Sequence, residues 1–156
     1  MRILLLLLAV IAVCYAQSSN NCTSLLCGVY QNQMGSTMKI TSASNSMFAG
    51  TYESAVGKAK GKYKLVGAYS GEELPATIGW TVTWNSPSTP NGTSTTSWTG
   101  VIAIGTPEKC RITNTCDPSV LYFITQWHLA MAVNPQNYWQ STLSGLDVFQ
   151  NVTSGY

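Results

Sequence analysis

Apolar and polar residues alternate along most of this chain, and this alternation constrains its fold more than any other feature. In residues 77–84 threonines occupy most of one phase and apolar residues occupy the other: Ile78, Trp80, Val82 and Trp84. Side chains that repeat every second residue lie on one face of a β-strand. No ten-residue segment carries apolar residues at the 3.6-residue spacing of a helix. The sequence therefore predicts an all-β protein.

Turn-forming residues divide the alternating sequence into eight short segments. Clusters of glycine, proline and asparagine separate these segments. The expected strands cover residues 27–33, 36–43, 47–53, 62–69, 77–84, 93–104, 120–132 and 138–151, the last beginning with an irregular turn around Trp139. Short links favour antiparallel neighbours. Eight such strands can close into an up-and-down β-barrel, which leaves no open edge and can enclose one small ligand. A β-sandwich is the alternative.

The first 16 residues have the pattern of a signal peptide. Met1 and Arg2 precede eleven apolar residues at positions 3–13, and Ala16 is a small residue suited to cleavage. The apolar run is shorter than the roughly 20 residues that a membrane-spanning helix needs. We therefore expect a secreted protein without a membrane partner, in which residues 17–156 form a single domain.

Charged residues are scarce, and this excludes several classes of function. They make up 9% of the chain, against about 25% in an ordinary soluble domain. The formal net charge of +2 gives no electrostatic footprint for nucleic acid. One histidine and six scattered acidic residues offer little to a metal site or to an acid–base catalyst. We therefore expect a protein that is not an enzyme and that holds no metal or cofactor.

The cysteines and the glycosylation sequons agree with export. If Cys14 leaves with the leader, an even number remains, which is typical of disulfide-bonded secreted proteins: Cys22, Cys27, Cys110 and Cys116. Two local pairs, Cys22–Cys27 and Cys110–Cys116, are one option, and links between the two regions are the other. Sequons begin at Asn21, Asn91 and Asn151, of which Asn91 lies in the most loop-like stretch.

One phase of the predicted barrel mixes tryptophans with small hydroxyls and a carboxylate. The phase that carries Trp84 and Trp98 also carries Thr96 and Asp147. A carboxylate that points inward must be paired or hydrogen-bonded. Polar groups placed among aromatic walls are typical of a ligand pocket. In the alternative interpretation, the tryptophans are core residues and the hydroxyls bond backbone groups.

Six segments resemble the avidin/streptavidin family, in the same order along the chain. They are NQMGS at 32–36, GTYESAVG at 50–57, GWTVTW at 79–84, STTSWTG at 94–100, TQW at 125–127 and WQSTLSGLDVF at 139–149. The resemblance covers residues 28–149. It implies an eight-stranded, non-catalytic barrel that binds biotin with high affinity and is usually tetrameric. The alternatives are an avidin-like module with altered small-ligand specificity, or one with a structural or interaction role.

The resemblance implies a set of residues for the ureido ring of biotin. Asn32, Ser36 and Tyr52 match the family's three donors to the ureido oxygen. Asp147 matches the acceptor for one ureido N–H, and the family places it against the residue that matches Asn32. Ser54 matches the acceptor for the other N–H. Three donors on one oxygen would polarise the ring toward an oxyanion-like form.

The remaining ligand contacts implied by the resemblance surround the rest of biotin. Thr96 matches the contact to the thioether sulfur, and Ser94 matches the hydroxyl near the carboxylate. Trp84, Trp98 and Trp127 match the aromatic box around the bicyclic ring and its chain. The lid loop matches four residues: Ala55, Val56, Gly57 and Lys58.

The resemblance also assigns residues to subunit contacts. Trp139 matches the tryptophan that reaches a neighbouring subunit's pocket, and one subunit interface matches Gln126, Ser144 and Leu146. Ser144 is small and polar where the family is often apolar, so we expect either a tetramer or a dimer. Tyr30 departs from the family's tryptophan at the barrel floor, which predicts an altered floor.

A hydrolase built on Ser94, His128 and Asp147 is the third interpretation. It fails on phase, because His128 alternates with the inward residues and would point away from the other two.

Overall fold

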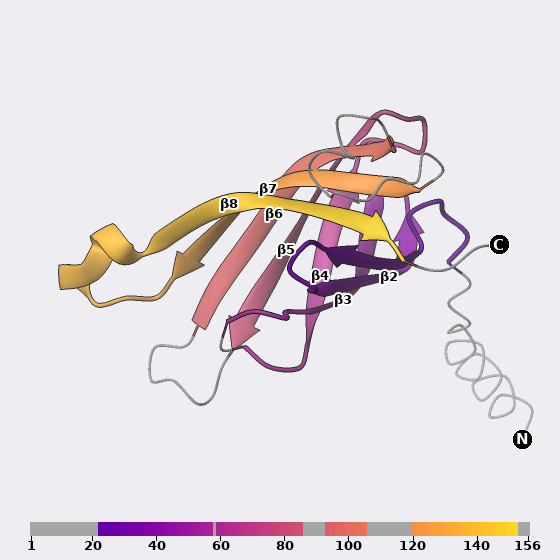
Figure 1. The fold of residues 1–156 in the computed structure, drawn as a ribbon. Coiled ribbons are helices and arrows are strands. Elements are labelled where there is room, and N and C mark those ends of the chain that lie inside the picture. The colour runs from indigo at the N-terminus through magenta and orange to yellow at the C-terminus, as the bar shows by residue number, and fades with distance from the viewer. Residues whose placement is uncertain (1–21, 58, 86–92, 106–119, 153–156) are drawn as a thin grey trace, which may run out of the picture.

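The computed structural model describes residues 22–57, 59–85, 93–105 and 120–152. Eight antiparallel strands close into one barrel in sequence order, with β1 paired to β8 (Figure 1). The bounds are β1 Gly28–Asn32, β2 Thr37–Ser44, β3 Met47–Glu53, β4 Lys62–Tyr69, β5 Ala76–Asn85, β6 Thr93–Ile104, β7 Leu121–Met131 and β8 Thr142–Asn151. The predicted up-and-down barrel is confirmed, and the sandwich is excluded because no open edge divides the sheet.

Some of the sequence-based predictions concern residues outside the described ranges. They are the signal peptide at 1–16, Lys58 of the lid, Cys110, Cys116, and the sequons at Asn21 and Asn91. Within the described ranges, no helix combines the length and the apolar character needed to cross a membrane.

The predicted last strand begins four residues too early. Residues Pro135–Gln140 form a 3-10 helix, η1, and β8 begins only at Thr142. Pro135 at the start of η1 supplies a backbone angle suited to a helix and lacks the N–H that a strand would use. The backbone N–H of Ser141 donates to the Tyr138 carbonyl at 3.0 Å and closes the last turn. The expected irregular turn around Trp139 is thus a short helix, drawn at the left of Figure 1 just before the start of β8.

The alternation of β5 appears in the structure as an inward and an outward face. Ile78, Trp80, Val82 and Trp84 are all buried, whereas the threonines between them are exposed or half-buried. Residues on neighbouring strands continue the inward face into one core, which includes Met38, Ile40, Phe48, Leu65, Ile102, Phe123 and Phe149. The apolar residues that alternate in the sequence therefore form the buried core of the barrel.

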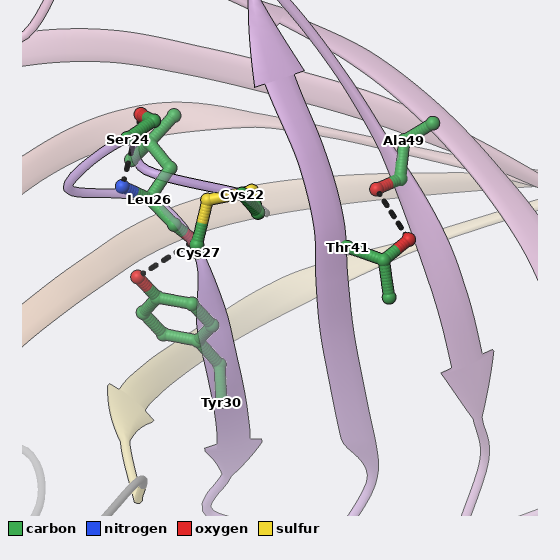
Figure 2. Close-up of a disulfide and its surroundings, with 7 residues drawn as sticks. All are labelled: Cys22, Ser24, Leu26, Cys27, Tyr30, Thr41 and Ala49. Atoms are coloured by element: carbon green, nitrogen blue, oxygen red, sulfur yellow. Dashed lines mark hydrogen bonds between the residues drawn. A yellow bond between two sulfur atoms is a disulfide. The ribbon is translucent and has the colours of Figure 1, made fainter. Parts of the chain in front are cut away.

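The N-terminal segment before β1 packs against the core and fills one end of the barrel. Cys22 and Cys27 form a disulfide, which selects the local pairing among the predicted options (Figure 2). Leu26, inside this small loop, is 1% exposed, and the Tyr30 hydroxyl donates to its carbonyl at 3.2 Å. The Tyr30 ring also stacks on Phe123 with centroids 4.2 Å apart. We call Leu26, Tyr30, Phe123 and the disulfide the closed end.

Candidate ligand-binding site

A cavity of about 920 Å³ occupies the barrel beyond the end of β1, away from the closed end. Its volume lies within the range of small-molecule sites, roughly 300–1,000 Å³. All ten residues that the sequence predicted as ligand contacts line it: Asn32, Ser36, Tyr52, Ser54, Trp84, Ser94, Thr96, Trp98, Trp127 and Asp147. Residues that are up to 115 positions apart in the chain thus meet at one cavity.

The turn between β1 and β2 fixes the orientation of the Asn32 amide. The backbone N–H groups of Met34 and Ser36 both donate to Asn32 Oδ1, at 3.1 and 2.8 Å. Gly35 adopts φ +84°, a conformation that favours glycine, and lets the chain turn back toward β2. Because two donors point at the same atom, that atom is the carbonyl oxygen. Asn32 Nδ2 is therefore left to donate, and it has no hydrogen-bond partner among the described residues.

Ser36 and Tyr52 present two further donors. The backbone N–H of Ala55 donates to Ser36 Oγ at 3.1 Å, and the Ser36 and Tyr52 hydroxyls, which carry one proton each, hydrogen-bond one another. Burial raises the pKa of Tyr52 well above its ordinary value; the Ser36 hydroxyl opposes this shift, and the charge of Asp147 adds to it. The Tyr52 phenol therefore stays protonated at neutral pH and can act only as a neutral hydrogen-bonding group.

Asp147 is a buried carboxylate held by neutral donors. The Trp98 indole N–H donates to Oδ2 at 2.9 Å, and Gln33 Nε2 donates to Oδ1 at 3.3 Å. The side chain is 7% exposed and forms no ion pair with a described lysine or arginine. Each carboxylate oxygen has two lone pairs. Capacity therefore remains at Asp147 to accept a hydrogen bond from a ligand.

The resemblance places Asp147 against Asn32, and both residues line the cavity. The amide that donates to Asp147 belongs to Gln33, the next residue in the turn.

The aromatic residues form walls with a hydroxyl set among them. Tyr52 lies at 5.0 Å, stacked, from Trp98 and at 5.6 Å, edge-on, from Trp84, measured between ring centroids. The Trp84 indole N–H donates to Thr96 Oγ1 at 2.8 Å. Thr96 therefore keeps its hydroxyl proton, which has no acceptor among the described residues. The walls are rigid and apolar, while Thr96 offers one donor.

Trp127 depends on a glycine across the sheet. Gly145 pairs with Trp127 in the β7–β8 ladder, and a Cβ at position 145 would lie 2.5 Å from Trp127 Cζ2. The glycine therefore leaves the space in which the half-buried Trp127 ring lies against β8.

The loop after β3 contributes Ser54 and part of the predicted lid. The Ser54 hydroxyl donates to the Val56 carbonyl at 2.6 Å and accepts from the Val56 N–H at 3.3 Å. With its proton engaged, Ser54 faces a ligand as an acceptor. Val56 and Gly57 line the cavity, whereas Ala55 does not line it and instead anchors the loop to Ser36.

A model described as the avidin family matches residues 19–152 of the sequence. The chain belongs to the avidin family. The match covers all eight strands of the barrel and every residue described around the cavity.

In this avidin-family barrel, the residues predicted at subunit contacts lie on the outside. Trp139 is 78% exposed and does not line the cavity of its own chain. Gln126 and Ser144 are exposed, and Leu146 is 54% exposed although it also borders the cavity. Asn151, which begins the remaining sequon, is the half-buried last residue of β8.

The outward face also accounts for His128, the single histidine. His128 is exposed and pairs with Ser97 and Ser144 on the neighbouring strands. Ser94 and Asp147 line the cavity, but His128 does not, so these three residues form no catalytic triad. Among the described residues, no three histidine, cysteine or acidic side chains gather as metal ligands.

The sequence missed several residues of the avidin-family cavity. Leu129 and Met131 continue the inward phase of Trp127, so the alternation carried a signal for them. Asn137 and Gln140 come from η1, where no alternation exists. Gln33 lies in a turn and belongs to the first family-like segment, but nothing in its spacing indicates its contact with Asp147.

Proposed function

We propose that this protein binds biotin and catalyses no reaction. The observation that carries the proposal is a set of hydrogen-bonding groups, gathered at one cavity, that matches a cyclic urea. Asn32, Ser36 and Tyr52 have donors to offer, while Asp147 and Ser54 offer acceptors. A cyclic urea has one carbonyl acceptor and two N–H donors, and this set complements it.

The fixed orientation of these groups supports tight binding. The Asn32 and Ser36 side chains are already held by backbone N–H groups before any ligand enters. Ordering a side chain on binding costs free energy, roughly 0.5–1.5 kcal/mol for each flexible group, and preorganised groups avoid that cost. Donors that converge on one oxygen in a site shielded from water are also stronger than in bulk water.

The rest of the cavity supports a ligand with an apolar, sulfur-containing ring and a chain. Trp84, Trp98 and Trp127 supply flat apolar surfaces, and the Thr96 hydroxyl proton is available as a weak donor to a thioether sulfur. Ser94, half-buried on β6, is placed to bond the polar end of a chain.

We further propose that the protein is secreted and self-associates. The leader-like residues 1–16 and the Cys22–Cys27 disulfide support an oxidising destination. Exposed apolar side chains on η1 and β8, such as Trp139 and Leu146, support contact with a second copy of the chain, as a dimer or a tetramer.

A biotin titration of the leader-free, disulfide-bonded protein tests the proposal. We expect quenching or shifting of tryptophan fluorescence and a melting temperature that rises with ligand concentration. Each tenfold excess above Kd should add about 1.4 kcal/mol to the free energy of unfolding. Pentanoic acid, which has the chain without the ureido ring, should cause neither change. No response at saturating biotin would refute the proposal and favour an altered ligand or a structural role.

An Asp147→Ala variant links the response to the site. Because the variant removes an acceptor with a charge, we expect affinity to fall by on the order of a hundredfold while the barrel stays folded. Thr142→Ala, exposed on the same strand and outside the cavity lining, is the matched control and should leave affinity unchanged. Equal affinities of the Asp147→Ala variant and the wild type would contradict the assigned site.

A further inference from the structure

We infer that Gln33 is a positioning residue that holds the Asp147 carboxylate in place and thereby determines how tightly a ligand N–H is bound. This inference rests on the proposed function for its ligand, although its structural part can be tested without one. It adds a residue that neither the sequence pattern nor the set of ligand contacts identifies.

Three hydrogen bonds join the Gln33 side chain to β8 on both sides of Asp147. Nε2 donates to the Leu146 carbonyl at 3.0 Å and to Asp147 Oδ1 at 3.3 Å. Oε1 accepts from the Val148 N–H at 3.0 Å. The amide thus uses both its donor and its acceptor on three consecutive residues.

Gln33 continues the β1–β8 pairing by means of a side chain. The backbone register between these strands ends at Asn32 opposite Phe149. The next backbone groups of β8 along the same edge, at Val148 and Leu146, bond the Gln33 amide. A carboxamide carries the same donor and acceptor as a peptide group, so it can substitute for one more strand residue. The Gln33 amide takes this place beside the cavity, at the point where the chain turns away from β8 after Asn32.

The carboxylate of Asp147 needs two anchors to have one orientation. The torsion about the Cβ–Cγ bond of aspartate is broad, so a single hydrogen bond leaves the group free to swing. The Trp98 indole holds Oδ2 and Gln33 holds Oδ1. With both oxygens held, the remaining lone pairs have fixed directions toward the cavity.

Within the described part of the chain, Asp147 is held by neutral donors and by no ion pair, so each of these donors matters more. No described lysine or arginine forms an ion pair with Asp147, and the side chain is buried. Hydrogen bonds to a charged group contribute more than those between neutral groups. Loss of the Gln33 donor should therefore be measurable in ligand affinity.

A matched pair of variants tests the inference. Gln33→Glu keeps the shape and the acceptor for the Val148 N–H, but it removes the donor and brings a second carboxylate to Asp147. Gln31→Glu makes the same charge change two residues earlier, where the side chain bonds the Gly35 carbonyl and does not line the cavity. We expect biotin affinity to fall tenfold to a hundredfold for Gln33→Glu and less than about threefold for Gln31→Glu.

A double-mutant cycle separates positioning from a general loss of stability. If Gln33 acts through Asp147, then Gln33→Glu should change affinity less than about threefold in an Asp147→Ala background. An equal loss in both backgrounds would overturn the inference. Gln33→Ala, which adds no charge, provides the same cycle if Gln33→Glu fails to fold.

A measurement without ligand distinguishes failure of this inference from failure of the proposed function. The Trp98 indole N–H bonds Asp147 directly, so its NMR resonance reports the orientation of the carboxylate. Gln33→Glu should shift that resonance and Gln31→Glu should not, whether or not the wild type binds biotin. An unchanged Trp98 resonance in a folded Gln33→Glu variant would refute the positioning role.

Discussion

The two ends of the barrel use the same alternating strands in opposite ways. At the closed end, the Tyr30 hydroxyl bonds the Leu26 carbonyl and its ring stacks on Phe123. At the cavity end, Asn32 and Tyr52 are also buried, but Asn32 Nδ2 has no acceptor among the described residues and the Tyr52 hydroxyl faces the cavity beside Ser36. Burial alone therefore does not distinguish core from site. The site differs because several hydrogen-bonding groups gather at one cavity.

Trp80 marks the boundary between the two ends. Its ring stacks on Trp98 with centroids 5.5 Å apart and meets Phe149 edge-on at 5.3 Å. Its indole N–H is buried and has no hydrogen-bond partner among the described residues. Trp80 therefore provides an apolar layer between the closed end and the cavity at the expense of one unsatisfied donor.

The largest expected effect comes from removing an aromatic ring at the closed end. Phe123→Ala deletes a fully buried side chain that stacks on Tyr30, and we expect a loss of about 3–5 kcal/mol in the free energy of unfolding. Chemical denaturation measures the loss. Biotin affinity of the folded fraction should change little, because Phe123 does not line the cavity. A large fall in affinity with little loss of stability would contradict the assignment of Phe123 to the closed end.

The converse is expected for a hydroxyl at the cavity end. Tyr52→Phe removes a donor to the ureido oxygen, so affinity should fall about tenfold, the equivalent of one hydrogen bond of roughly 1.4 kcal/mol. Stability without ligand should be unchanged or slightly higher. Calorimetric titration and thermal melting of the same samples test both statements, and unaltered affinity would show that Tyr52 belongs to the core.

The pKa of Tyr52 predicts how stability depends on alkaline pH. Because burial raises this pKa in the folded state, the contribution to stability is complete below the ordinary tyrosine value of about 10 and is lost as pH rises above it. The loss should approach about 1.4 kcal/mol per pH unit. Urea melts at pH 9, 10 and 11 measure it, and Tyr52→Phe should lack this part of the dependence. Identical profiles would contradict the assigned burial.

The smallest effect is expected from the hydroxyl at the closed end. Tyr30→Phe keeps the stacked ring and removes the hydrogen bond to Leu26, for a loss of about 0.5–1.5 kcal/mol in stability. Affinity for biotin should not change. A loss of affinity as large as that of Tyr52→Phe would show that the two ends are coupled.

The barrel was predictable because alternation and turn residues both act locally. The inward phase of β5 and the order of the strands follow from residues that are neighbours in the chain. The helix η1 was not predicted, because six residues without alternation carry no period-two signal and Pro135 fits either a turn or a helix start.

The candidate site was predictable where residues lie in strands and less so where they lie in turns. Trp84, Thr96 and Asp147 share the inward phase, and the family-like segments indicated each of them. The role of Gln33 depends on a contact across 114 positions between a turn and β8, which no local pattern encodes. The Cys22–Cys27 pairing was one of several connectivities, and only the spatial arrangement selects it.

A crystal structure of the complex with biotin would show directly whether these residues hold the ureido ring. We expect the ureido oxygen to accept hydrogen bonds of about 2.6–3.2 Å from Asn32, Ser36 and Tyr52. We also expect the two ureido N–H groups to donate to Asp147 and Ser54. A ureido ring bound elsewhere, or one whose oxygen is bonded only by water at the mouth of the cavity, would contradict this expectation.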